Sequence, residues 1–596
     1  MNCGSHSNLR ILLLALIAIV GLLLGLSGCV GVTHAGPITQ PVPDQLTVTL
    51  AGGGKGAVTS SPTGINCGTT CSATFTNGTS VTLTAAPGPG VTFAGWGGAC
   101  SGTTLTCAVA VNATTTVSAT FNPPSLQSIN HIVFLAQENR SFDHYFGALR
   151  EYWAQNGIPD QAFNGLPQFN IPAGAAPTNP GCDPTQPLPA DCKYDPAHLI
   201  TSYHLTTQCI ENPSPSWNES HVDWSFTDPS AANSTTAALD GFVWTAAHDA
   251  RNQTPIPYND VDGVRAMGYY DGTDLNFYYF MASNFATSDA WFSPVMSRTD
   301  PNRMYLIAAT SQGHVYPLNQ TNSPPLTATT IFQELQAAGI TWKIYVNPAG
   351  TQPPCSDTDS ACLLTHTTIE NFAYRSTIPL QNVVSIKQYF ADAANGTLPQ
   401  VALIEPAFSA GLDEHPTVQD RFPSRIQAGA QYVQSLITAI MGTPQNPSPS
   451  WKDTAFILTF DEGGGLYDHV QPQTGPTEVS PDGIKPSDLS TNPPDVCIVV
   501  PGATCDFTYS GYRVPMIVVS PFAKKNFVSH TVMDYTAILK LIETRFGVPA
   551  LTKRDAAQPD MGAEFFDFTN PQWITPPATP AQNTNDACTL TPPAPG

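Results

Sequence analysis

Basic residues are scarce in this chain. Lys and Arg number 23 against 45 Asp and Glu in 596 residues, which gives a formal charge of −22 at pH 7. A surface that binds the phosphate backbone of DNA or RNA needs clustered positive charge, so the composition argues against a nucleic-acid partner. It also disfavours tight electrostatic docking on an anionic lipid surface, although it leaves room for a brief encounter with a zwitterionic head group.

Cysteine pairs with the spacing of zinc ligands are also lacking among the 14 cysteines. Once Cys3 and Cys29 are set aside the count is even, as a disulfide framework in an oxidising compartment requires. Spacing alone does not establish the pairing, but five pairs of close neighbours are candidates: Cys67 with Cys71, Cys100 with Cys107, Cys182 with Cys192, Cys355 with Cys362, and Cys497 with Cys505.

A long apolar run occurs at the N-terminus, from Ile11 to Leu24, directly after Arg10. A transmembrane anchor is the rival interpretation, but the run is short and small residues follow it at once. The tetrapeptide Leu26-Ser-Gly-Cys29 resembles the lipobox of bacterial lipoproteins. This resemblance implies that residues 1–29 are a lipoprotein signal peptide and that Cys29 is the acylated first residue of the mature chain. We therefore expect an exported protein, either a cell-envelope lipoprotein held on the membrane by its lipid anchor or an extracellular protein.

A Pro- and Gly-containing linker, residues 30–44, leads into a stretch of different composition, residues 45–123. There Thr, Val, Gly and Ala dominate, charge nearly disappears, and short alternating segments lie between turn signals, which predicts a small all-β module. Gly95-Trp-Gly-Gly98 and two cysteine pairs resemble the divergent B-repeat modules of bacterial surface proteins, which implies a spacing or adhesive role. We expect Trp96 in the core of this module rather than on a ligand-binding platform.

Strands and helices alternate from residue 125 onward, which predicts an α/β catalytic domain over 125–557. The loop-rich stretch 149–235 is long enough that we expect it to shape the pocket. Residues 558–596 form a Pro- and Thr-rich C-terminal tail, and Cys588 is a candidate for holding this tail against the rest of the chain. Apolar runs predict strands at 304–308, 341–345, 401–404 and 516–519, and helical periodicity predicts helices at 330–338, 426–441 and 533–546.

Two further apolar runs each end in a pair of side-chain oxygens. Ile132–Ala136 precedes Glu138 and Asn139, and Ala455–Phe460 precedes Asp461 and Glu462. Either pair alone could be a helix cap or a solvated loop. Strands of an open α/β sheet place their ligands at their carboxyl ends, however, so two such pairs predict one metal site. Hard oxygen donors suit calcium, magnesium, manganese or iron better than zinc, and the sequence leaves the identity of the divalent ion open.

The segment Glu138-Asn-Arg-Ser-Phe-Asp-His-Tyr-Phe-Gly147 is similar to the signature of a bacterial phosphoesterase family that holds the phosphatidylcholine-hydrolysing phospholipases C and an acid phosphatase branch. The resemblance extends over about Ser128 to Ala557. It implies an α/β/α sandwich of the alkaline phosphatase superfamily type. The other motifs that carry it follow in order: Arg298-Thr-Asp-Pro-Asn-Arg303, Asp413-Glu-His-Pro416, Phe460-Asp-Glu462, Tyr467-Asp-His469, Arg513-Val-Pro515 and Ser529-His-Thr531.

Thr299 matches the position at which the family presents a hydroxyl that binds the metal and attacks phosphorus. A metal lowers the pKa of a bound hydroxyl and so makes a usable nucleophile. A Thr before Pro301 could equally open a turn, and Ser297 is the competing hydroxyl. Arg303 is a candidate for neutralising phosphate charge, with a structural ion pair to Asp300 as the alternative. Arg140 is a second candidate for neutralising phosphate charge, with a structural ion pair to Asp143 as the alternative.

Histidines would supply hydrogen bonds to the phosphate and the general acid. His415 matches an active-site position of the family. His221 lies in a stretch that resembles a His-containing loop of the family, although the chain departs from the pattern just before it. His469 and His530 are candidates either for contact with the phosphate or for a supporting position behind the residues that make that contact.

Three functions remain open at this stage. The resemblance favours a phospholipase C that hydrolyses the head-group phosphodiester of a phospholipid. Its other branch implies an acid phosphatase that acts on small phosphomonoesters with the same catalytic residues. A surface adhesion or binding protein with an inactive hydrolase fold is the third hypothesis, and the intact set of candidate ligands speaks against it.

Overall fold

The computed structural model describes residues 43 to 590 with gaps. The residues outside the description are 1–42, 187–189, 230–236, 255, 316, 319–323, 352, 409, 418–424, 475–508, 586 and 591–596. The expected signal peptide with Cys29, most of the linker, and the Cys497–Cys505 pair therefore lie outside the described residues.

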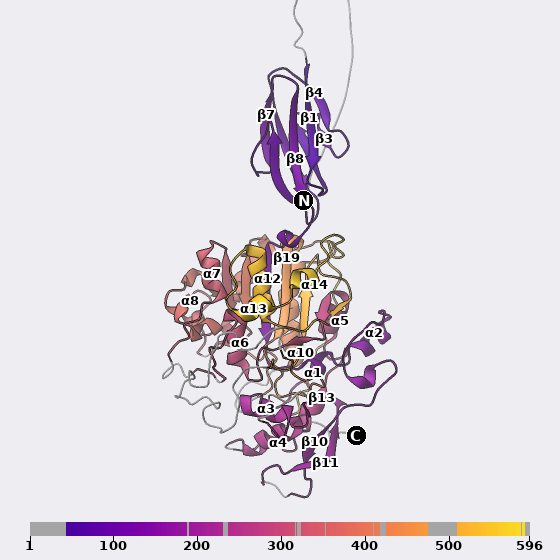
Figure 1. Cartoon of the computed structure of the whole chain (residues 1–596), viewed down its shortest axis with the longest axis vertical. Helices are drawn as coiled ribbons and strands as arrows, with labels where there is room; N and C mark the ends of the chain where they lie inside the picture. Colours follow the sequence, from indigo (N-terminus) through magenta and orange to yellow (C-terminus); the bar gives the residue numbers. More distant parts are fainter. Residues whose placement is uncertain are drawn as a thin grey trace, which may run out of the picture.

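The first unit is an all-β sandwich at one end of the molecule (Figure 1). Its two four-stranded sheets have the orders β4-β1-β8-β6 and β3-β2-β5-β7, and β1 pairs with β8 in parallel. Trp96 is buried among the apolar side chains of this unit, as expected, and donates its indole N–H to the Thr104 carbonyl at 2.8 Å. The strands are β1 Pro43–Ala51, β2 Gly56–Ser61, β3 Asn66–Cys67, β4 Ser72–Thr76, β5 Thr79–Pro87, β6 Thr92–Gly98, β7 Thr106–Val111 and β8 Thr115–Asn122.

The second unit is built on an eight-stranded mixed sheet of order β17-β16-β18-β9-β19-β20-β14-β21. β20 runs antiparallel to both of its neighbours, and the other described pairs in this sheet are parallel. β9 and β19 lie in the middle and are buried along nearly their whole length, as their apolar runs predicted. The strands are β9 His131–Gln137, β14 Ala286–Ser288, β16 Trp342–Val346, β17 Val383–Ser385, β18 Val401–Ile404, β19 Thr454–Phe460, β20 Met516–Val519 and β21 Phe527–Ser529.

Two groups of helices cover this sheet, α5 with α9 and α10, and α6 with α7 and α12. Together with the sheet they confirm the predicted α/β class with an N-terminal all-β region. Among the described residues no helix is both long and apolar enough to span a membrane. The helices are α1 Phe142–Phe146, α2 Leu149–Asn156, α3 Trp217–Trp224, α4 Phe242–Asn252, α5 Asn276–Asn284, α6 Thr299–Ala308, α7 Ile331–Ala337, α8 Ser360–Leu364, α9 Ile386–Asn395, α10 Ile426–Met441, α12 Thr536–Phe546, α13 Lys553–Ala557 and α14 Met561–Phe565.

Most predicted elements of the second unit are confirmed, and one is wrong. The helix at 426–441 is α10, and the strands at 401–404 and 516–519 are β18 and β20. The run 304–308, predicted as a strand, is the last half of helix α6. A short apolar run fits a buried helix as well as a buried strand. Here the run is helical and buried because α6 packs against both α7 and α12.

Small strand pairs extend from the sheet toward the loops. They are β10 Thr178–Cys182 with β11 Tyr194–Thr201, β12 Tyr203–His204 with β13 Gly268–Tyr269, and β15 Trp291–Phe292 with β22 Met533–Asp534. The predicted helix 533–546 therefore starts later than expected, because its first two residues form β22. In Figure 1, β10, β11, α3 and α4 lie at the end of the molecule away from the sandwich.

Disulfide bonds close several local loops and attach the C-terminal tail. Four of the expected neighbouring pairs are bonded, Cys67–Cys71, Cys100–Cys107, Cys182–Cys192 and Cys355–Cys362. A fifth bond joins Cys209 to Cys588, 379 residues apart. The C-terminal tail is thereby pinned back onto the second unit.

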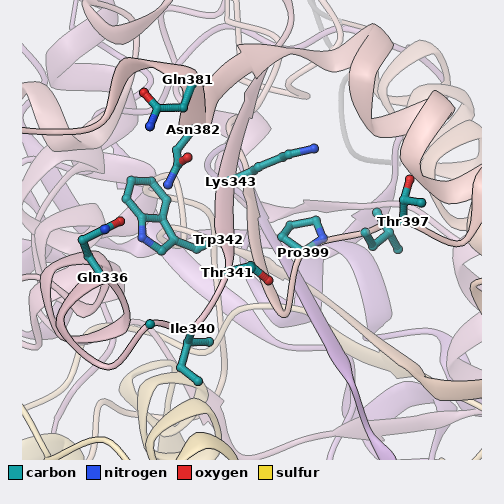
Figure 2. A pocket seen from close by; sticks show the side chains of 11 residues that line it. Gln336, Ile340, Thr341, Trp342, Lys343, Gln381, Asn382, Thr397 and Pro399 are labelled. Carbon is teal, nitrogen blue, oxygen red and sulfur yellow. The ribbon is translucent and has the colours of Figure 1, made fainter.

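The sandwich adjoins the amino ends of the central strands. Ser128, just before β9, donates to the Gly90 carbonyl of the sandwich. The ring of His131, the first residue of β9, lies 2.9 Å from the Pro399 carbonyl. At this same edge the segment before β18 and the start of β16 line a pocket of about 510 Å³ (Figure 2).

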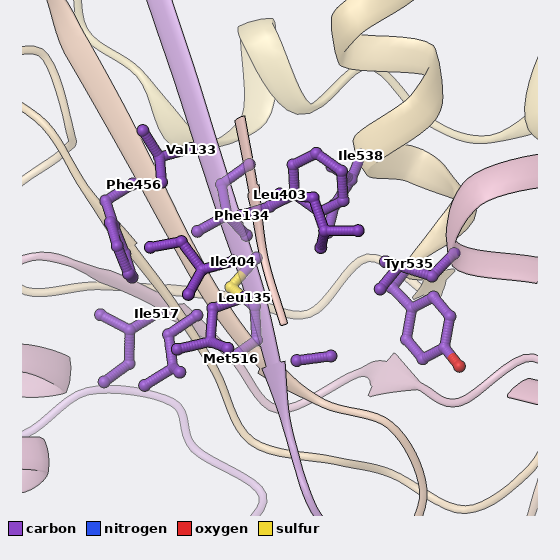
Figure 3. Packing of buried hydrophobic residues seen from close by; sticks show 14 of the residues in the cluster. Val133, Phe134, Leu135, Leu403, Ile404, Phe456, Met516, Ile517, Tyr535 and Ile538 are labelled. Atoms are coloured by element: carbon purple, nitrogen blue, oxygen red, sulfur yellow. The ribbon is translucent and has the colours of Figure 1, made fainter. Parts of the chain in front are cut away.

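Part of the core of the second unit lies between the central strands and α12. Figure 3 shows Phe134 and Leu135 of β9 among side chains of β18, β19 and β20, with Ile538 of α12 beside them. Tyr535, immediately before α12, donates its hydroxyl to the Asp461 carbonyl at 3.1 Å. The core thus anchors the carboxyl end of β19, where the candidate site begins.

Candidate active site

The carboxyl ends of β9 and β19 bring the two predicted oxygen pairs together. Gln137, the last residue of β9, pairs with Phe460, the last residue of β19, so the two strands end level with each other. The amide N–H of Asn139 then donates to Asp461 Oδ1 at 2.9 Å. Both oxygen pairs therefore lie at one edge of the sheet.

The glycine run after Glu462 allows a close approach at this edge. Asn139 has a left-handed backbone with φ of 55°, and Gly464 has φ of 72°. A Cβ at Gly464 would stand 2.4 Å from the Asn139 carbonyl oxygen, which real side chains essentially never do. Glycine at this position lets the loop after β19, which carries Asp461 and Glu462 and is called the acidic loop below, pack directly against Asn139.

Thr299 is the first residue of α6 and points at the ends of β9. Its Oγ1 is 3.3 Å from Glu138 Oε2 and 3.3 Å from Asn139 Oδ1. The residue is half-buried, unlike the fully buried carboxylates beside it. The competing hydroxyl of Ser297 is buried and donates to the Val315 carbonyl. Of the two, the structure brings Thr299 to the predicted ligands.

Arg303 lies one helical turn after Thr299 and joins two of the carboxylates. Its Nη2 is 2.6 Å from Glu138 Oε1 and its Nε is 3.3 Å from Asp461 Oδ2. The guanidinium also lies over the ring of Phe408, 5.2 Å from its centre. Its remaining nitrogen, Nη1, is buried and has no hydrogen-bond partner. Arg303 therefore balances charge at this edge and keeps one donor free.

The three carboxylates of the site lie close together and are buried. Burial raises the pKa of Glu138 and of Glu462 well above the usual range, and the neighbouring charge of Asp461 raises both further. Arg303 opposes the effect at Glu138. Glu138, Asp461 and Glu462 are each at most 2% exposed. Arg303 alone leaves this negative charge undercompensated, which favours a further cation.

The donor set fits a divalent metal ion. Glu462 Oε1 is buried without a hydrogen-bond partner, as expected of an oxygen that ligates an ion, and Asp461 Oδ2 has no hydrogen bond beyond its ion pair with Arg303. Carboxylate, amide and hydroxyl oxygens are the ligands of hard cations. Two groups of acids and histidines in the described chain have ligand atoms within 4.8 Å of one another, and both lie elsewhere: Asp143 with Asp468 and His469, and His204 with Asp271 and Asp274.

His415 reaches the site through Asn139. Its Nε2 accepts from Asn139 Nδ2 at 2.9 Å, and its Nδ1 faces the Pro416 carbonyl. These partners fit a neutral ring that carries its proton on Nδ1. Burial lowers the pKa of His415, although the charge of Asp413 opposes the shift. His415 is thus held as a neutral imidazole beside Glu138, Asn139, Thr299, Asp461 and Glu462, which are called the oxygen cluster below.

Glu414 fixes the backbone that presents His415. Its carboxylate accepts from the hydroxyls of Tyr145, at 2.6 Å, and Tyr278, and its carbonyl accepts from Arg140 Nε at 2.8 Å. Its φ of 70° is unusual for a non-glycine residue. Burial raises the pKa of Glu414 to about 7. No role was predicted for Glu414, and its place inside the Asp413–Pro416 motif was the only sequence signal.

His221 lies near the C-terminal end of α3. Its Nδ1 is 2.6 Å from the Trp217 carbonyl, within the same helix, and the residue is 7% exposed. The segment before α3 packs on the acidic loop, because a Cβ at Gly465 would stand 3.0 Å from the Ser214 carbonyl. The structure thus places α3 beside the loop that carries Asp461 and Glu462.

His469 belongs to a separate ion-pair network under α1. Its Nδ1 is 2.6 Å from Asp143 Oδ2, and Asp143 also pairs with Arg513 at 3.0 Å. Arg513 bonds Asp468 at 2.7 Å and stacks on a ring of α1. Asp143 therefore pairs with Arg513, whereas Arg140 holds Glu414, a division that the sequence did not reveal.

His530 pairs with Asp289 at 2.8 Å, and its side chain is 51% exposed. In their described contacts, neither His530 nor His469 touches the oxygen cluster of Thr299. Both take part in supporting the loops around the sheet edge.

Comparison with known proteins bears on both units of the chain. The model of the "Phosphoesterase family" matches residues 129–549, and that of the "Divergent InlB B-repeat domain" matches residues 46–125. Both resemblances expected from the sequence are therefore confirmed.

Among curated relatives, "Phospholipase C B" of Mycobacterium tuberculosis is 30% identical over 469 residues, which cover 74% of this chain and 78% of the relative. "Non-hemolytic phospholipase C" of Pseudomonas aeruginosa is 28% identical over 78% of this chain and 60% of its own length. "Non-specific phospholipase C5" of Arabidopsis thaliana is 27% identical over 67% of this chain and 66% of its own. A solved alkaline phosphatase superfamily protein from Vibrio parahaemolyticus aligns with a TM-score of 0.26 and 11% identity, too weak a likeness to support an argument.

Proposed function

The chain belongs to the phosphoesterase family and is a hydrolase of phosphate esters, and from this premise we propose that it is a metal-dependent phospholipase C with Thr299 as its nucleophile. The observation that carries the proposal is the position of Thr299 Oγ1, 3.3 Å from an oxygen of Glu138 and 3.3 Å from one of Asn139. The names of the relatives support a phospholipid as substrate.

Five residues would hold the divalent ion: Glu138, Asn139, Thr299, Asp461 and Glu462. The bound ion would supply positive charge to the phosphoryl oxygens and would lower the pKa of the threonine hydroxyl. Arg303 Nη1, a buried donor without a partner, is a candidate for an additional hydrogen bond to those oxygens.

The reaction divides into two displacements. Thr299 Oγ1 gives its proton to Glu138 Oε2, which returns it in the second step, and forms a bond to phosphorus as the bond to the diacylglycerol oxygen breaks. That oxygen leaves with a proton from His221, or from His415 once its Nε2 carries one. Water then attacks phosphorus and breaks the bond to Thr299, which releases the phosphorylated head group. His415 Nε2, which accepts from Asn139 Nδ2 in this structure, can take the proton of that water once it gives up that hydrogen bond.

The test compares wild type with Thr299→Ala, Thr299→Ser and Ser297→Ala on p-nitrophenylphosphorylcholine and p-nitrophenyl phosphate, with chelator and after addition of Mg²⁺, Ca²⁺, Mn²⁺ or Fe²⁺. We expect Thr299→Ala to lose turnover by about a thousandfold or more, because the covalent step is removed. Thr299→Ser should retain a measurable rate, and Ser297→Ala should act as the matched control. Full activity of Thr299→Ala would refute the proposed nucleophile.

The two substrates separate the alternatives. Preference for the choline diester supports the phospholipase C, and preference for the monoester makes the enzyme an acid phosphatase. If the metal-loaded wild type turns over neither ester, the surface-adhesion hypothesis gains instead.

We also propose that the protein is exported and lipid-anchored. Five disulfides in the described chain suit an oxidising compartment, and the lipobox-like Leu26-Ser-Gly-Cys29 supports acylation of Cys29. Cys29→Ser should move the protein from the membrane fraction to the soluble fraction of expressing cells. An unchanged distribution would refute the anchor.

A further inference from the structure

The pocket at the amino edge of the central sheet is separate from the candidate active site. It opens where β16 and β18 begin, whereas the oxygen cluster follows the carboxyl ends of β9 and β19. Its walls come from the end of α7, the turn Leu380–Asn382 and the segment before β18 (Figure 2). Its volume of about 510 Å³ lies in the range of small-molecule sites.

The side chains around the pocket are polar but carry almost no free charge. Gln336, Gln381 and Asn382 bring three amide groups, and Figure 2 shows Gln336 and Asn382 on either side of Trp342. The lining cation, Lys343, is paired with Asp392 at 2.5 Å, and in Figure 2 its ammonium group points away from Trp342. The lining therefore selects for hydrogen bonding rather than for charge.

Trp342 supplies an independent sign of a ligand-binding site. Its side chain is 2% exposed and its ring packs on Phe332, 4.9 Å between centres. The indole N–H is nevertheless without a hydrogen-bond partner. A buried donor left unpaired is costly, so such a group calls for an acceptor. The side chain of Gln336 beside it is exposed and can turn aside to admit one.

We propose that this pocket binds a neutral carbohydrate of one to a few sugar units. A sugar hydroxyl both donates and accepts, so it can pair with the carbonyl and the NH₂ group of each amide and can accept from the Trp342 N–H. Ile340 and Pro399, also in the lining, offer apolar contact to the C–H faces of a sugar ring. The pocket lies on the edge that adjoins the B-repeat sandwich, since the Pro399 carbonyl contacts the start of β9. The molecule would thus combine ester hydrolysis at one edge with glycan attachment at the other.

The experiment titrates the full chain with maltotriose, cellotriose, mannotriose and N,N′-diacetylchitobiose, followed by calorimetry and tryptophan fluorescence. The variants are Asn382→Leu, Gln336→Leu and Trp342→Phe, the last of which keeps an aromatic ring but removes the N–H. Asn156→Leu, an exposed amide on α2, is the matched control. All four variants lie outside the proposed catalytic residues, so unchanged hydrolysis of a p-nitrophenyl ester verifies that each is folded.

We expect at least one of these sugars to bind at millimolar concentration or below. Its affinity should fall about tenfold or more in each pocket variant, as the loss of a hydrogen bond predicts, and should stay unchanged in Asn156→Leu. Binding of none of the sugars, or binding that the pocket variants do not weaken, would overturn the proposal. Binding of the anionic polygalacturonate in preference to the neutral sugars would also overturn it.

Discussion

Glu414 should make the stability of the second unit depend on pH. Its carboxyl is fully buried beneath the His415 loop, and burial raises its pKa from 4.5 to about 7. Because the folded-state pKa lies above the unfolded value, the proton on Glu414 favours the folded chain. This contribution is complete below about pH 4.5 and is lost as the pH rises through about 7.

The size of the effect follows from the two pKa values. The difference between 4.5 and about 7, at about 1.36 kcal/mol per pH unit, corresponds to about 3 kcal/mol in the free energy of unfolding. Glu414→Gln removes the titration but keeps an acceptor for the hydroxyls of Tyr145 and Tyr278. The variant should therefore lack this part of the pH dependence, and relative to wild type it should gain stability between pH 5 and pH 8.

The assay is urea denaturation of both proteins from pH 4 to pH 8, followed by tryptophan fluorescence. The difference between the two free energies of unfolding isolates Glu414 from other titrating groups. Tyr278→Phe is a useful companion, because it removes a hydrogen bond that stabilises the charged carboxylate and should steepen the loss of stability toward pH 8. Parallel curves for wild type and Glu414→Gln would refute the reasoning.

Other perturbations have equally definite outcomes. Arg513→Met leaves Asp468 buried without its cation and Asp143 with only His469, and it should cost about 3 to 5 kcal/mol in a denaturant titration, whereas a loss below about 1 kcal/mol would contradict the buried ion pairs. Divalent ions added to chelator-treated protein should raise the Tm of wild type but not of Asp461→Asn, and equal shifts in both would argue for ion binding elsewhere. Replacing Cys209 and Cys588 together by Ser should lower the free energy of unfolding by about 2 to 5 kcal/mol and expose the tail to protease, while an unchanged cleavage pattern would show that other contacts hold it.

The sequence was most informative where structure depends on neighbouring residues. The apolar runs of β9 and β19 predicted buried strands. The residues that follow the two strands were predicted to share one edge of the sheet, and the pairing of Gln137 with Phe460 shows that the strands end side by side. The periodicity of 426–441 matched α10 at both ends. Local pairs of cysteines were equally readable, because short loops restrict the possible partners.

Contacts between distant segments could not be predicted. The choice of Arg513 rather than Arg140 as the partner of Asp143 depends on a loop 370 residues further along the chain. The same holds for Cys209 with Cys588, and for Glu414, whose two tyrosine partners lie on α1 and α5. The run 304–308 was misread for a related reason, since burial by α7 and α12 makes a helix as apolar as a strand.

The direction of β1 determines how far the start of the sandwich lies from the candidate active site. β1 starts at Pro43 and runs parallel to β8, which leads directly toward the second unit, so Pro43 stands at the far end of the sandwich. Eight residues of β8 and seven of β9, at about 3.3 Å each, place roughly 50 Å of strand between Pro43 and the oxygen cluster, to which the connection 123–130 adds. A surface that holds the chain near Pro43 would have the chemistry pointed away from it, so the ester within range is one presented by a facing surface or carried in solution, rather than one lying beside the point of attachment.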